Sequence, residues 1–167
     1  MNRNSWITFR TVLWIGLVAG TLDIAENFVF SQLRGVSPWI VCQYIASGLI
    51  GTQAFQGGWA SVVLGVVIHY IIALIWTSVF YAVARKFAVV MRRPVLSGLL
   101  YGGVVYLIMT FIVVPHSSVP HPLRPITLIS RINAVLAILL CIGLTISLLM
   151  RRTLFQARSQ ADDVESR

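Results

Sequence analysis

The chain has 167 residues, of which 57% are hydrophobic and only 11% are charged. Soluble domains average about 45–50% apolar and about 25% charged residues, so this composition excludes an ordinary soluble domain and indicates an integral membrane protein. The net charge of +8 does not indicate nucleic-acid binding. The basic residues cluster at the ends of apolar segments, as in membrane proteins, and leave no continuous basic surface with interleaved aromatic residues.

Four apolar segments predict membrane-spanning helices, because about 20 residues are needed to cross the hydrocarbon core as a helix. They cover about residues 12–30, 59–84, 95–114 and 128–150. A helix satisfies its backbone hydrogen bonds within the segment, as lipid requires. The sequence therefore predicts an all-α fold, an integral membrane four-helix bundle whose single transmembrane domain covers residues 1–150.

The distribution of Lys and Arg predicts the orientation of these spans. Ten of the thirteen basic residues lie on one side, whereas Arg34, Arg124 and Arg131 lie on the other. Short loops rich in Lys and Arg stay in the cytoplasm, so both termini of this multi-pass protein are predicted to be cytoplasmic. Residues 151–167 are predicted to form a disordered cytoplasmic tail, which ends in the polar run ADDVESR.

Two connecting segments on the outer side have recognisable patterns. Ser37-Pro38 is a helix start, with a capping serine and a proline at the first helical position. The apolar run from Trp39 to Ile50 is too short to span the membrane and predicts a short interfacial helix between the first two spans, or alternatively a re-entrant one. The segment 116–126 contains three prolines and is predicted to be extended or turn-like.

Small residues recur at helical spacing in the spans. Gly16 and Gly20 share one stripe of the first helix with Asp23 and Asn27. Glycines four residues apart allow another helix backbone to approach closely. The residues predicted to serve helix packing are Gly16, Gly20, Gly65, Gly98 and Gly102.

The most informative polar residues are Asp23 and Glu26, inside the first span. A carboxylate at mid-bilayer depth costs about 2.5 kcal/mol or more on insertion scales, so both are expected to face protein or water. Depth in the membrane follows from the helical rise of about 1.5 Å per residue. Asp23 lies about 10 Å below the outer end of its span, and His69 lies about 15 Å below the outer end of its own. Glu26 lies about 6 Å and Arg131 about 5 Å below the outer ends of their spans. These depths suggest the pairs Asp23–His69 and Glu26–Arg131. With Asn133 as a hydrogen-bonding neighbour, these residues form the predicted binding site.

Three interpretations of this cluster remain open. The charges can be structural and fix the helix register, or they can handle a proton or ligand, since a buried carboxylate beside a histidine has an environment-dependent pKa. A metal or haem site is the third, but the ligands are too few, so no metal and no cofactor is expected. There is no nucleophile elbow, P-loop or dinucleotide fingerprint, so no catalytic residue is assigned, and an enzyme is the less favoured class. Cys42 and Cys141 are expected to be free thiols.

The runs Gly16-Leu-Val-Ala-Gly-Thr-Leu-Asp23, Gly35-Val-Ser-Pro38 and Arg93-Pro-Val-Leu-Ser-Gly-Leu-Leu-Tyr-Gly102 carry a resemblance, as do residues 45–51 and 54–58. The chain resembles a family of small, uncharacterised bacterial four-span inner-membrane proteins. More loosely, its third span and proline loop resemble the YagU-like inner-membrane proteins associated with acid resistance. The resemblance implies a bacterial inner membrane as the location.

Three functions are compatible with these features. The first is a small binding or permeation unit of unknown ligand, organised around the polar cluster. The second is an accessory subunit that packs against a larger membrane complex. The third is an intramembrane lipid- or quinone-modifying enzyme. The expected partners are the lipid bilayer and a homo-oligomer or larger complex, and not nucleic acid.

Overall fold

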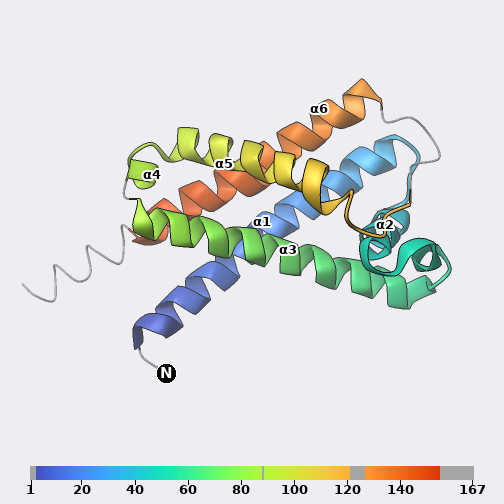
Figure 1. The fold of residues 1–167 in the computed structure, drawn as a ribbon, viewed down its shortest axis with the longest axis horizontal. Helices are drawn as coiled ribbons and strands as arrows, with labels where there is room; N and C mark the ends of the chain where they lie inside the picture. The colour runs from blue at the N-terminus through green and yellow to red at the C-terminus, as the bar shows by residue number, and fades with distance from the viewer. Residues whose placement is uncertain (1–2, 88, 121–126, 155–167) are drawn as a thin grey trace, which may run out of the picture.

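The computed structural model describes residues 3–87, 89–120 and 127–154, and every long element in these ranges is a helix (Figure 1). Four helices are long and apolar enough to cross a membrane. The predicted all-α four-helix bundle is therefore confirmed. The first two crossing helices are α1 (Arg3–Leu33) and α3 (Gly58–Lys86).

The other two crossing helices each contain a π-helical segment. Span three (Pro94–Val113) combines α5 (Pro94–Ile108) with the π-helical turns Met109–Val113. Span four (Leu128–Leu154) begins as α6 (Leu128–Ala137) and passes through the π-helical segment Ile138–Leu144. Each π-helical segment shifts the faces of the helix on its two sides relative to one another.

The long helices extend beyond the predicted spans. α1 has 31 residues and α3 has 29, which correspond to about 46 and 43 Å of helix. Both lengths exceed the hydrocarbon core of about 30 Å, so these helices are tilted or project from it. Span four remains helical to Leu154, four residues into the segment predicted as a tail. The rest of that prediction, on residues 155–167, lies outside the described residues.

The core of the bundle receives apolar side chains from all four spans. Phe80 of α3 and Ile15 of α1 are among its largest fully buried members. Large apolar side chains are exposed along the outer faces of every span, which fits contact with a lipid bilayer. The buried core residues are Ile15, Ala19, Phe80, Ala84, Val105, Ile142, Ile146 and Met150.

A short helix, α2 (Pro38–Ile50), connects α1 to α3 and begins as the sequence predicts. The Ser37 hydroxyl accepts a hydrogen bond from the backbone N–H of Trp39, and Pro38 occupies the first helical position. α2 packs on α1 and α3 and approaches α3 so closely that a Cβ on Gly65 would clash with the Cys42 carbonyl oxygen. A 3₁₀ turn, Gly51–Phe55, leads from α2 back to α3.

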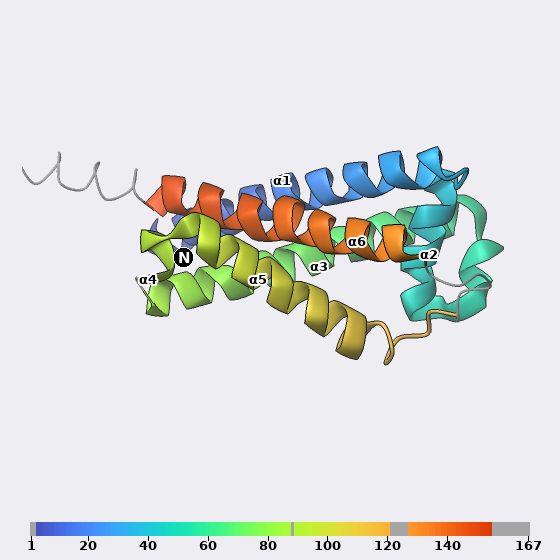
Figure 2. The ribbon, with the colours of Figure 1, turned by 90° about the horizontal axis from the view of Figure 1, so that it is seen from above.

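Span three packs on span four through glycine. A Cβ on Gly143 would clash with the carbonyl oxygen of Gly98 and would lie 2.8 Å from the Cα of Gly102. Such short separations let two helix backbones touch directly. α5 packs mainly on the π-helical segment of span four and much less on α6, and Figure 2 shows its far end diverging from α6. Beyond that end the chain returns to α2, where the Ser118 N–H donates to the Gly48 carbonyl.

Candidate functional site

The site begins with the packing of α1 on α3. A Cβ on Gly16 would meet Leu74 and Thr77, and a Cβ on Gly20 would meet Ala73 and Tyr70. The two glycines therefore face α3, as the small-residue stripe predicts. Asp23 lies one helical turn beyond Gly20, so the same close contact brings its carboxylate near α3.

Two hydrogen bonds join α1 to α3 just below the carboxylates. His69 Nε2 lies 2.8 Å from the Gly20 carbonyl oxygen, and Thr21 Oγ1 lies 2.9 Å from Tyr70 Oη. A carbonyl oxygen can only accept, so this bond places a proton on His69 Nε2. The other ring nitrogen, Nδ1, is then free to accept or bind a second proton. The bonds pair consecutive residues of α1 with consecutive residues of α3, which fixes the register of the two helices.

Both predicted carboxylates are half-buried, and each has one oxygen that is fully buried. Asp23 Oδ1 and Glu26 Oε2 have no hydrogen-bond partner among the residues that the structure describes. The charges of His69 and Glu26 both act on the Asp23 carboxylate, the first favourably when the ring is protonated and the second unfavourably. Leaving a buried acceptor unsatisfied costs about 1–3 kcal/mol, and more when the group is charged. A bound proton, water molecule or cation would therefore stabilise these two oxygens.

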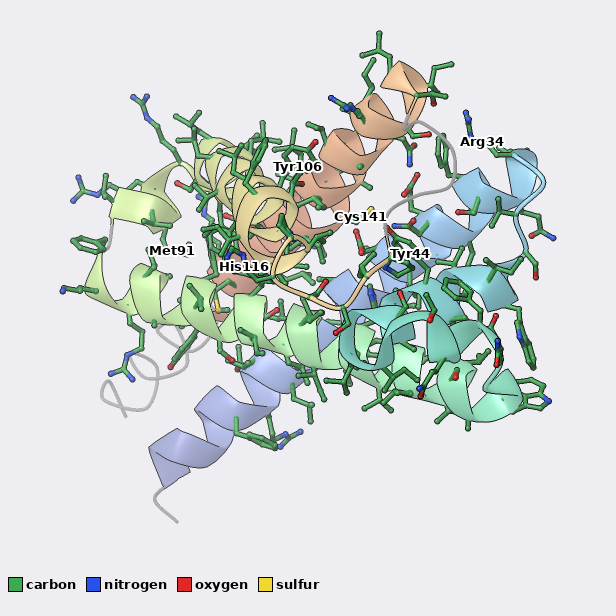
Figure 3. The ribbon with its side chains drawn as sticks, turned by 45° about the vertical axis from the view of Figure 1, so that its right-hand side comes forward. Arg34, Tyr44, Met91, Tyr106, His116 and Cys141 are labelled. Atoms are coloured by element: carbon green, nitrogen blue, oxygen red, sulfur yellow. The ribbon has the colours of Figure 1, made fainter. Side chains whose placement is uncertain are left out.

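Cys141 completes the cluster from the opposite helix. It lies midway along span four, inside the π-helical segment, and its thiol is free. The charges of Asp23 and Glu26 both act on it, and Figure 3 shows its side chain between span four and α1. The sequence analysis expected only a free thiol at Cys141, because helical spacing within span four does not show which residues of the first span it meets.

The structure does not bring Arg131 or Asn133 into bonding contact with the carboxylates. Arg131 is exposed on α6, and Asn133 is half-buried. Within the described part of the chain, neither side chain makes a hydrogen bond or an ion pair, so the suggested pair Glu26–Arg131 is not formed. Depth along the helix gave these residues similar heights, but it said nothing about the direction in which each side chain points.

In the described ranges, no group of three or more His, Cys, Asp and Glu side chains is arranged to hold a metal ion. The arrangement instead offers two carboxylates, an imidazole and a thiol, which between them can bind and release protons. Thr21 and Tyr70 extend this polar layer, and sequence reasoning missed both. Their only signal was that each follows a residue already singled out, Gly20 and His69.

Comparisons with protein-family models, with curated proteins and with solved structures each found no match for this chain. The resemblance to a bacterial inner-membrane family stays a prediction from sequence. The function is therefore inferred from the chemistry of the polar cluster and from its position in the bundle.

Proposed function

We propose that this multi-pass membrane protein is a small binding or permeation unit for a cation, and in the simplest case for a proton. The observation that carries the proposal is the pair of buried, unpartnered carboxylate oxygens on Asp23 and Glu26. The bacterial inner membrane, with both termini in the cytoplasm, is the location that goes with it.

The polar cluster differs from a set of buried charges whose only role is to fix the helix register. Buried charges that fix helix register are paired and hydrogen-bonded, since an unpaired one costs several kcal/mol. Here no basic side chain in the described ranges neutralises Asp23 or Glu26 by an ion pair. The His69 ring lies close enough for its charge to act on the Asp23 carboxylate. Two buried carboxyl groups without a basic partner favour a proton or another cation as the ligand.

The depth of the polar groups in the membrane also supports the proposal. Asp23 lies about 15 Å of helix from Leu33, the outer end of α1, and Glu26 about 10 Å. Cys141 lies near the middle of span four. The polar groups therefore extend from the outer third toward the centre of the membrane, which is where a transported ion needs a replacement for water.

A flux measurement tests the proposal. The purified full-length protein is reconstituted in liposomes that contain a pH-sensitive dye, and a potassium diffusion potential drives proton entry. We expect flux in the parent protein and its loss in Asp23→Asn and Glu26→Gln. Asn27→Ala, an exposed polar position on the same helix, is the matched control and should keep the flux.

Two results would count against the proposal. One is a folded, reconstituted protein that carries no proton or alkali-cation flux and binds neither. The other is loss of Asp23→Asn from the membrane while Asn27→Ala accumulates normally, which would assign the carboxylate a structural role.

A role as an accessory subunit is the second candidate, and span three favours it. Leu100, Val104 and Leu107 are exposed along α5, and a Cβ on Gly103 would have open space around it. A helix of another chain could approach at Gly103. Native mass spectrometry of protein extracted from its own membrane tests this role, because a subunit would carry a second polypeptide in fixed stoichiometry.

A further inference from the structure

A cluster of cations surrounds the end of the bundle where α3 ends, span three begins and span four ends. All six side chains are exposed, and Figure 1 shows their elements meeting at the same end of the molecule. These residues, called the basic end below, are Arg85, Lys86, Arg92, Arg93, Arg151 and Arg152.

Nothing in the described part of the chain neutralises the basic end. The contacts of Arg85 and Lys86 are with the rings of Tyr81 and Phe87, at 5.9 and 5.6 Å from the ring centroids. None of the six side chains forms an ion pair with a described residue. Asp23 and Glu26, the two acids in the described ranges, lie in the half of α1 that is farther from the basic end (Figure 1). Six like charges on one surface attract anions and repel one another.

The level of the basic end relative to the membrane is set by its apolar neighbours. The short helix α4 (Val89–Arg92) anchors Met91 and Val90 against the core, and Figure 3 shows Met91 beneath α4. Phe87 and Val89 are 50% and 65% exposed. Exposed apolar side chains at the same level as arginines are typical of the boundary between hydrocarbon and headgroups. A soluble anion would give no reason for these exposed apolar groups.

We propose that the basic end binds anionic phospholipid headgroups of the adjoining leaflet, which is the cytoplasmic leaflet in the predicted orientation. Arginine guanidinium groups donate paired hydrogen bonds to phosphate oxygens. The apolar side chains of α4 lie where the acyl chains begin. The proposal is independent of the cation site, because the two regions share no residue.

The chain contains one competing anion. Asp162, Asp163 and Glu165 belong to the C-terminal segment that follows span four in sequence, and that segment lies outside the described residues. If it covered the basic end, lipid would be excluded. The test therefore includes a full-length variant in which these three acids are replaced by their amides.

The experiment titrates the full-length protein in neutral detergent with short-chain phosphatidylglycerol, or with the matching phosphatidylcholine, and counts bound lipids by native mass spectrometry. We expect preference for phosphatidylglycerol. Each basic residue near a membrane surface contributes about 1 kcal/mol, so Arg93→Gln should weaken binding about 5-fold, and Arg92→Gln with Arg93→Gln about 25-fold. Arg34→Gln, an exposed arginine at the opposite end, is the matched control and should bind as the parent does.

Three outcomes would overturn the proposal. The first is equal binding of the two lipids by the parent protein. The second is equal weakening by Arg93→Gln and Arg34→Gln, which would show attraction by net charge alone. The third is preference for phosphatidylglycerol only after the three tail acids are neutralised, which would identify the tail as the occupant of the basic end.

Discussion

The contact between span three and span four leads to a sharp prediction, because two neighbouring glycines of α5 have opposite surroundings. A Cβ on Gly102 would lie 2.8 Å from the backbone Cα of Leu139 and 3.0 Å from the carbonyl oxygen of Ile138. A Cβ on Gly103 would have no atom within 4 Å. The same substitution, glycine to alanine, is therefore a perturbation at one position and its control at the next.

The size of the effect follows from the geometry. Ordinary contact begins at about 3.4 Å, so Gly102→Ala must push span four away by about 0.6 Å at this point. Because the atoms in the way belong to backbone, no side-chain rotation can relieve the clash. A gap of 0.5–1 Å forfeits a quarter to a half of each dispersion contact nearby. Overpacking of this kind costs about 1–3 kcal/mol, and we expect Gly102→Ala to fall in that range.

The assay is reversible unfolding of the purified protein in mixed micelles with increasing SDS, followed by tryptophan fluorescence. Gly103→Ala should change the free energy of unfolding by no more than about 1 kcal/mol, and in the stabilising direction, since alanine favours helix over glycine. Equal stabilities for Gly102→Ala and Gly103→Ala would refute the close backbone contact and with it the described crossing of spans three and four.

Three further predictions concern single contacts. Tyr70→Phe removes the hydrogen bond to Thr21 and should lower the free energy of unfolding by about 0.5–1.5 kcal/mol, and no further loss should follow when Thr21→Val is added. Ser147→Ala removes a buried 2.7 Å hydrogen bond to the carbonyl of Pro94, the first residue of α5. The same SDS titration should show a loss of about 1–3 kcal/mol in the free energy of unfolding. Ser78→Ala loses only a local hydrogen bond within an exposed helical turn, and its loss should be less than half as large. Burial raises the pKa of the Cys42 thiol, which lowers its thiolate fraction at pH 8. Maleimide should therefore label the folded protein more slowly than the unfolded protein, by more than steric access alone explains. This difference in labelling rate should become smaller as the pH rises.

The architecture was predictable because lipid leaves few choices. An apolar segment of about 20 residues has to be helical, since its backbone groups find no water, and four such segments can only pack as a bundle. α2 was predictable from local chemistry, because the Ser37 hydroxyl and Pro38 specify a helix start whatever surrounds them. The close packing at Gly16 and Gly20 was also predictable, because glycine has no side chain that would keep a neighbouring helix away.

The π-helical segments were not predictable. The segment Ile138–Leu144 has the sequence of an ordinary apolar helix, and it is the part of span four on which α5 mainly packs. The extra residue per turn changes which side of span four faces α1. A regular α-helical wheel does not show which residues of span four come near Asp23.

The polar cluster was half predictable for a similar reason. Insertion cost and helical spacing require Asp23 and Glu26 to face the bundle, and both are half-buried there. Axial rise gives depth but not rotation about the helix axis. Depth along the helices paired His69 with Asp23, and the charge of the ring acts on that carboxylate, yet its hydrogen bond is to the Gly20 carbonyl. Arg131 matched Glu26 in depth, yet its side chain is exposed and unpaired with it.

The hydrogen bond from His69 to Gly20 limits what the cluster can be. With Nε2–H committed to a carbonyl, the ring can gain or lose a proton only at Nδ1. A histidine that served only as a fixed counter-charge would donate both its protons to carboxylates, and Asp23 Oδ1 and Glu26 Oε2 would not both be left without a partner. His69→Gln separates these roles, because glutamine can keep the donor to Gly20 but has no titratable nitrogen. If His69 is structural, the variant will match the parent in both stability and proton flux, whereas a proton-binding role requires normal stability with reduced flux.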